Sequence, residues 1–167
     1  MVPRLSFEEL TDSSDLVVSG SIIRSWAAWD SGHKYIWTHY EISVASAPKG
    51  KTASTVEFAE PGGTLGGVAH AIAGSVSYRP GEQVVVFLQK MPNGYLRTTG
   101  WGQGKYSLDS AGRVHGSALR AAEVVGLRQP SRASTSLETL DGMSLRDLAL
   151  RVSARVRGTA PTAGGAK

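Results

Sequence analysis

The chain has 167 residues, of which 41% are hydrophobic and 19% are charged, with 20 glycines, 7 prolines and no cysteine. This length fits one domain with a core of its own. The absence of cysteine excludes disulfide scaffolds, thiolate metal sites and cysteine nucleophiles. The longest apolar runs, such as Val84 to Leu88, are far too short to cross a bilayer.

The net charge of +4 is distributed unevenly along the chain. Residues 1–117 contain ten basic and ten acidic side chains, so this part is neutral. Residues 118–167 contain eight basic and four acidic side chains and carry the whole excess. The charge permits an anionic partner without requiring one, and any such partner is expected at the C-terminal end of the chain.

The first predicted element is a short helix that ends near Thr11. Ser6 and Glu9 have the spacing of a capping box, in which the serine side chain accepts from the Glu9 amide and the glutamate side chain accepts from the Ser6 amide. Three strands rich in β-branched and aromatic residues follow, at 16–23, 35–44 and 52–60. The alternation in the second of them slips between Trp37 and Tyr40, which predicts a bulge there.

Turn residues separate the next group of predicted strands. Asn93-Gly94 favours a tight hairpin because both residues tolerate a positive φ. Strands are expected at 83–89, 95–99 and 105–108, with a last hairpin into Val114. Gly20, Gly74 and Gly102 are the residues expected at sharp strand bends.

The periodicity becomes helical after Ser117. A weak helix is predicted at 118–125, a polar linker at 129–136 and a stronger helix from the Ser144 cap to Gly158. Its apolar positions form a narrow stripe suited to packing on the strands: Leu145, Leu148, Val152 and Val156. Its polar positions include Arg146, Arg151, Arg155 and Arg157, with Asp147 spaced to pair with Arg151.

These elements predict a mainly β fold: a five- to six-stranded antiparallel OB-like barrel with a short N-terminal helix and C-terminal helices. The expected organisation is an OB-like barrel domain with its N-terminal helix at 1–117, a helical appendage packed on the barrel at 118–158 and a disordered tail at 159–167.

Several of these segments resemble a family of uncharacterised bacterial exported proteins. The matching segments are Ser6 to Leu10, Asp15 to Gly20, Pro61 to Gly67, Arg79 to Glu82 and Gly102 to Lys105. This resemblance implies an extracytoplasmic location, periplasmic or secreted, if a signal peptide was removed upstream of Met1, and a cytoplasmic location otherwise.

A more distant similarity is to the netrin-like, or tissue-inhibitor-of-metalloproteinase-like, OB-fold. Asp15, Val17 and Gly20 match the opening strand of that fold. The similarity implies a five-stranded barrel flanked by terminal helices. The N-terminal cysteine through which those inhibitors reach the protease metal is absent here, so no functional residue is carried over.

The residues offer little for catalysis. His39 and Glu41 share one face of a strand, and His33, His70 or His115 could join them as zinc ligands, but polar side chains on a half-exposed strand are the better explanation of so loose a spacing. The glycine-rich segments do not connect a strand to a helix as a phosphate-binding loop does, and no nucleophile elbow is present. We therefore expect no catalytic residue, no bound metal and no cofactor.

Two groups of residues are candidates for binding. Aromatic and basic side chains could form a ligand platform, although core packing explains the aromatics too: Trp26, Trp29, Trp37, Trp101 and Lys34. Arg146, Arg151 and Arg155 could bind an acidic partner or form a solvated helix face. The predicted function is a non-enzymatic binding or assembly module that recognises another protein. The alternatives are a single-stranded nucleic-acid binder and a metal-dependent hydrolase.

Overall fold

The computed structural model describes residues 3–116 and 135–159. The helical elements are α1 (Phe7–Ser13), η1 (Trp101–Gly104), η2 (Leu137–Leu140) and α2 (Leu145–Thr159). The strands are β1 (Leu16–Trp29), β2 (Ile36–Lys49), β3 (Thr55–Pro61), β4 (Gly63–Leu65), β5 (Val68–His70), β6 (Gln83–Lys90), β7 (Leu96–Thr98), β8 (Lys105–Leu108) and β9 (Val114–Gly116). The predicted helix at 118–125, most of the predicted linker and the tail from residue 160 lie outside the described residues.

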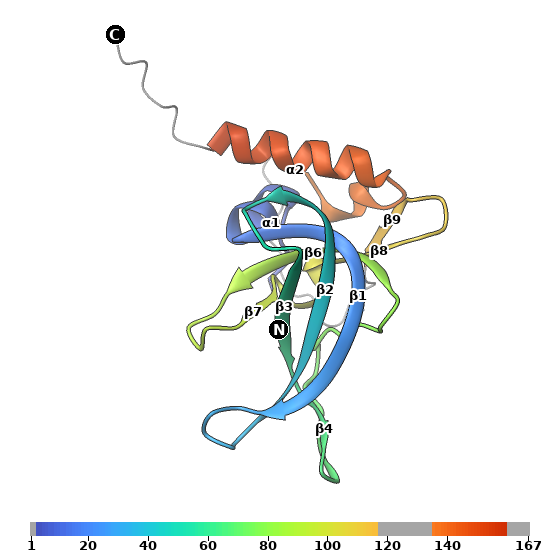
Figure 1. Cartoon of the computed structure of the whole chain (residues 1–167). Helices are drawn as coiled ribbons and strands as arrows, with labels where there is room; N and C mark the ends of the chain where they lie inside the picture. Colours follow the sequence, from blue (N-terminus) through green and yellow to red (C-terminus); the bar gives the residue numbers. More distant parts are fainter. Residues whose placement is uncertain (1–2, 117–134, 160–167) are drawn as a thin grey trace.

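The strands form one antiparallel sheet in the order β3-β2-β1-β6-β8-β9, with β7 also paired to β6 and the β4–β5 hairpin separate. The sheet is strongly curved (Figure 1). Its described strands do not close into a barrel, because β3 and β7 do not pair. The Glu60 side chain of β3 bridges them, since it accepts from the Thr98 amide at 2.8 Å and from Arg97 Nε at 3.3 Å. The mainly β, antiparallel class with short terminal helices is confirmed.

β1 is much longer than the sequence predicted, since it continues past Ile23 to Trp29. With β2 it forms a long hairpin whose tip projects away from the helices (Figure 1). The register of the β1–β2 pair shifts at three places along β1: between Val17 and Ser19, between Ser19 and Gly20, and between Ile22 and Arg24. The bulge predicted in β2 was wrong: Trp37 and Tyr40 pair in continuous register, and aromatics simply occupy both faces.

Gly20 lies where β1 and β2 approach each other too closely for a side chain. A Cβ built there would lie 1.9 Å from the carbonyl oxygen of Ser43. The predicted role of Gly20 at a bend is consistent with the register shift next to it. Gly74 and Gly102 lie in a loop and in η1, so their predicted roles as strand bends were wrong.

Both faces of the sheet are buried, which explains the nearly unbroken apolar sequence of β6. Val84, Val86 and Leu88 alternate with Val85 and Phe87 and point into two different cores. The inner core, enclosed by the curved sheet, comprises Leu16, Val18, Ile22, Tyr40, Ile42, Val56, Phe58, Val76, Tyr78, Val84, Val86 and Leu88. The outer core lies between the sheet and the helices and comprises Phe7, Leu10, Val17, Val85, Phe87, Tyr106, Val114, Leu140, Leu148 and Val152.

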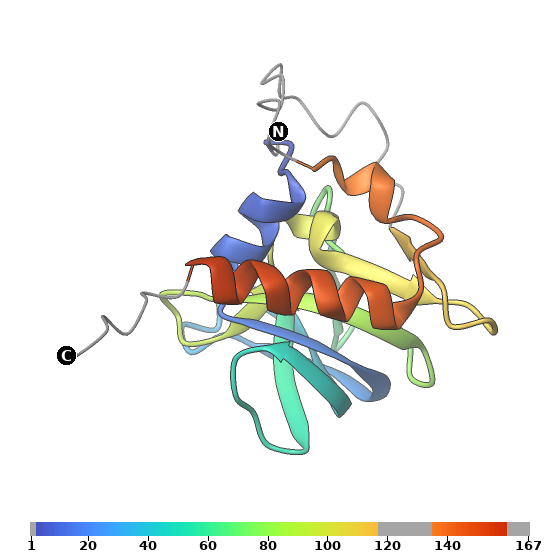
Figure 2. The same ribbon diagram turned by 90° about the horizontal axis from the view of Figure 1, so that it is seen from above.

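The helices cover the outer core, with α1 and α2 lying across one face of the sheet (Figure 2). The capping box of α1 is present, and Ser144 caps the first turn of α2 through the Asp147 amide at 3.1 Å. Leu148 and Val152 of the predicted stripe are fully buried. No helix in the described ranges is long and apolar enough to cross a membrane.

Candidate functional site

The most distinctive surface feature is a row of aromatic rings on the outer face of the β1–β2 hairpin. Trp26 pairs with His39 and Ala28 pairs with Trp37 across the two strands. Because side chains alternate along a strand, these four residues lie on the same face. Tyr95, from the turn between β6 and β7, completes the row. We call Trp26, His39, Tyr95 and Trp37 the aromatic ridge.

The rings of the ridge contact one another in sequence. Trp26 and His39 are stacked, with ring centroids 5.4 Å apart and an interplanar angle of 11°. Tyr95 presents T-shaped contacts to His39 at 5.2 Å and to Trp37 at 5.3 Å. His39 is buried beneath its neighbours, whereas the three other rings are partly exposed. The contacts hold the rings in fixed orientations, as aromatic pairs in this geometry do.

Charged side chains border one end of the ridge. The Arg24 guanidinium lies 4.3 Å from the centre of the Trp26 ring and pairs with Glu41 at 3.3 Å. Glu57 Oε1 lies 3.2 Å from Nδ1 of His39, and Glu41 and Glu57 are opposite each other on β2 and β3. One guanidinium and two carboxylates leave this border with an excess of negative charge.

The other predicted tryptophans do not belong to the ridge. Trp29 lies on the opposite face of β1, where it stacks on His33 at 4.4 Å and meets the edge of His70 at 5.7 Å. Trp101 lies in η1 beneath the Arg97 guanidinium, at 4.1 Å. The structure therefore brings together only two of the four predicted tryptophans.

The predicted basic residues are also separate from the ridge. Lys34 lies at the hairpin tip, over the ring of Tyr35. Arg155 makes a two-point contact with Asp12, at 3.0 and 2.6 Å, and so ties α2 to α1. Arg146 and Arg151 are exposed on α2, at the opposite end of the molecule from the hairpin tip (Figure 1). Among the described ion pairs, none joins Asp147 to Arg151.

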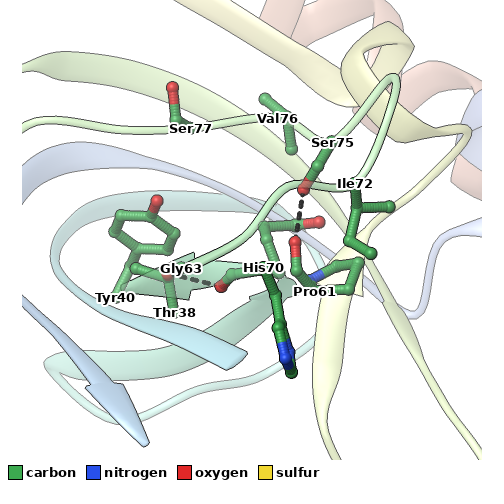
Figure 3. Close-up of a pocket in the computed structure, with 11 residues that line it drawn as sticks. Thr38, Tyr40, Pro61, Gly63, His70, Ile72, Ser75, Val76 and Ser77 are labelled. Atoms are coloured by element: carbon green, nitrogen blue, oxygen red, sulfur yellow. Dashed lines mark hydrogen bonds between the residues drawn. The ribbon is translucent and has the colours of Figure 1, made fainter. Parts of the chain in front are cut away.

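A small polar cavity of about 190 Å³ lies at the open edge of the sheet (Figure 3). It is lined by Thr38, Tyr40, Glu60, Pro61, Gly62, Gly63, His70, Ile72, Ser75, Val76 and Ser77. Several of its polar groups are already used in local hydrogen bonds: Thr38 Oγ1 donates to the Gly62 carbonyl, and Ser75 Oγ donates to the Pro61 carbonyl, both at 2.8 Å.

Glu60 is the unusual group of this cavity. Its side chain is 2% exposed and accepts hydrogen bonds from the Thr98 amide and from Arg97 Nε, the latter at 3.3 Å. Burial raises the pKa of Glu60 to about 7, against the opposing effect of these hydrogen bonds and of the Arg97 charge. Glu60 ties β7 to β3, and Arg97 in turn lies over Trp101.

The histidines do not converge on a metal site. In the described ranges, no three His, Asp or Glu side chains are arranged to hold a metal ion. His39 faces Glu57, His115 Nε2 lies 2.7 Å from Asp109, and His33 and His70 lie on the Trp29 face.

Sequence reasoning missed His39 and Tyr95 as ridge members. A period of two from Trp37 to His39 was visible, but the contact of Tyr95 depends on the packing of the β6–β7 turn.

Comparisons of this chain with protein-family models, curated proteins and solved structures gave no match.

Proposed function

We propose that this protein is a non-enzymatic binding module that recognises another protein through the aromatic ridge. The observation that carries the proposal is a row of four rings in mutual contact, in which Trp26, Tyr95 and Trp37 are partly exposed and the buried His39 joins Trp26 to Tyr95. Aromatic and arginine side chains supply most of the binding energy in protein interfaces. Rings that are already ordered lose little conformational freedom when a partner binds.

The charge around the ridge supports a protein partner over a polyanion. Single-stranded nucleic acids bind to rings that lie beside a basic groove. Arg24 lies over the Trp26 ring, and its charge is already paired with Glu41. Glu57 adds a second carboxylate, on a side chain that is 56% exposed. A phosphate backbone along this face would meet repulsion, whereas a peptide with basic or neutral side chains would not.

One observation keeps single-stranded nucleic acid as the second candidate. OB-folds bind oligonucleotides on the face of their second and third strands, between two flanking loops. The ridge shares β2 with that face, although its other strand is β1, and it adjoins the Tyr95 turn. Stacking of bases on Trp26 and Trp37 would then be the main source of affinity.

A displayed library of short random peptides tests the first proposal. We expect selection on the wild-type protein to enrich a consensus peptide that binds at least about tenfold more weakly to Trp37→Ala. Trp101→Ala is the matched control, because it removes the same side chain from a position without ridge contacts. Enriched peptides that bind equally to the wild type and to Trp37→Ala would contradict the role of the ridge.

Titration with single-stranded oligothymidylate separates the two candidates. A protein-recognition ridge predicts no quenching of tryptophan fluorescence at low ionic strength. Quenching that weakens steeply as salt is added, and that is lost in Trp37→Ala, would replace protein recognition by nucleic-acid binding as the function.

A further inference from the structure

The outer half of β1 has a strand on one side only. β1 pairs with β6 through residues Leu16 to Ser21, whereas its pairing with β2 continues to Trp29. From Ile23 to Trp29, no described strand pairs with the second edge of β1. This part of the hairpin projects beyond the rest of the sheet (Figure 1).

Hydrogen bonds at each end show which backbone groups face this edge. Ile22 is bonded to Gly81 and Glu82, on the side away from β2. At the hairpin tip, the Ile36 carbonyl accepts from the Gly62 amide and so faces away from β1. Ile36 is paired with Trp29, so the backbone amide and carbonyl of Trp29 face away from β2, toward the open edge. Backbone groups alternate along a strand, and the outward residues are therefore Ser25, Ala27 and Trp29. Within the described residues, no hydrogen bond to their outward amides and carbonyls is present.

The β4–β5 hairpin lies beside the side chains of Ala27 and Trp29, but it makes no described hydrogen bond to this edge, which carries few of the devices that normally prevent strands from pairing. Protected edges carry proline, lysine or several charges, or are covered by another segment. The stretch from Ile23 to Trp29 contains one charge, Arg24, and no proline or lysine. Ile23 is 48% exposed, and Ser25 is exposed as well. By contrast, the far edge of the sheet is covered, because β9 bonds to Met143 and Asp141 from the η2–α2 segment.

We propose that two copies of this chain pair through these edges, antiparallel and centred on Ala27. A two-fold axis at Ala27 places Ser25 opposite Trp29 of the second copy. It also places Trp26 opposite Ala28 of that copy. Each pair of outward residues then exchanges two backbone hydrogen bonds, as antiparallel strands do.

Charge and size favour this register over its neighbours. Centring on Ala27 brings Arg24 opposite Asp30 of the second copy, whose Oδ1 already accepts from the Lys34 amide at 2.7 Å and is held in place. A parallel, in-register pair would place Arg24 against Arg24 and repel. An antiparallel pair centred on Trp26 would lose the contact between Arg24 and Asp30 and would oppose two tryptophans.

Pairing in this way joins the two sheets into one continuous sheet. Side chains of one parity stay on one face, so the ridges of the two copies lie side by side on that face. The dimer would present two identical binding surfaces to a partner. Dimerisation itself rests on the β1 edge alone and does not depend on the proposed function of the ridge.

Single cysteines provide a direct test, because the chain has none of its own. In the proposed dimer, residue 27 faces its own copy at about 5.5 Å between Cα atoms, a distance that a disulfide can span. Two residues at position 25 lie about 14 Å apart and cannot be bridged. We expect Ala27→Cys to give a covalent dimer under mild oxidation and Ser25→Cys to stay monomeric. Equal cross-linking of both variants, or of neither, would overturn the proposal.

Sedimentation equilibrium of variants at one exposed position provides a second test. Ser25→Pro removes an outward amide that has no partner in the monomer, whereas Ser25→Ala keeps it. We expect Ser25→Ala to dimerise like the wild type and Ser25→Pro to dimerise at least tenfold more weakly, with circular dichroism unchanged. A wild type that stays monomeric at millimolar concentration, or that pairs only with an added extended peptide, would refute self-pairing.

Discussion

Glu60 makes the stability of this protein depend on pH in a direction opposite to that of ordinary surface carboxylates. Its pKa rises from 4.5 to about 7 on folding, so the folded state holds the proton more tightly than the unfolded state. The stability from this group is fully present below pH 4.5 and is lost as the pH rises through 7. The difference of about 2.5 pH units corresponds to about 3 kcal/mol.

Glu60→Gln isolates this contribution, because glutamine cannot ionise. The free energy of unfolding of the variant, minus that of the wild type, should increase by about 3 kcal/mol between pH 4 and pH 8. If glutamine makes weaker hydrogen bonds than glutamate, the difference in the free energy of unfolding changes by the same amount at every pH. The predicted increase between pH 4 and pH 8 is therefore unaffected. Urea denaturation followed by tryptophan fluorescence measures both proteins across the range.

The control is Glu138→Gln, which removes a carboxylate whose side chain is 74% exposed. Its difference curve provides the baseline for losing one acidic group. A Glu60→Gln curve that is parallel to this baseline would refute the reasoning, since it would show that Glu60 keeps the same proton affinity in the folded and unfolded states.

Three further predictions concern the folding of the chain. Leu148→Ala should lower the free energy of unfolding by about 2–5 kcal/mol, whereas the exposed Leu150→Ala should change it by less than about 0.5; equal losses would contradict the docking of α2. Gly20→Ala should disrupt the β1–β2 pairing and lower the melting temperature sharply, and a wild-type melting curve would show that the strands can separate at no cost. Ser6→Ala should cost about 1 kcal/mol in urea denaturation, and an unchanged midpoint would show that the α1 cap is dispensable.

The elements with strong local signals were predicted well from the sequence. The α1 capping box, the β6 and β8 strands and the apolar stripe of α2 all lie where the residues indicated. Each of these signals is complete within a few residues, so the rest of the chain does not have to be known. Once β1 is known to extend to Trp29, the three-residue spacing of Trp26 and Trp29 also places them on opposite faces.

The candidate site was predicted only in part. Trp26 and Trp37 were chosen as platform residues, but Trp101 lies under Arg97. Tyr95 was not chosen because its sequence position, after a tight Asn-Gly turn, says nothing about the strand that the turn packs against. Which rings meet is decided by the curvature of the sheet and by the placement of the β6–β7 turn.

The sequence by itself determined a mainly β chain whose helices dock through apolar stripes, because alternation and helical spacing record which side of each element is buried. Tertiary structure decided how far the sheet closes and what Glu60 does there. Closure depends on strand register and twist summed over the whole sheet, which no local pattern specifies. Glu60 lies in a strand that contains both polar and apolar residues, and nothing in the sequence marks it as unusual. Its burial against Thr98 and Arg97 is what changes its proton affinity.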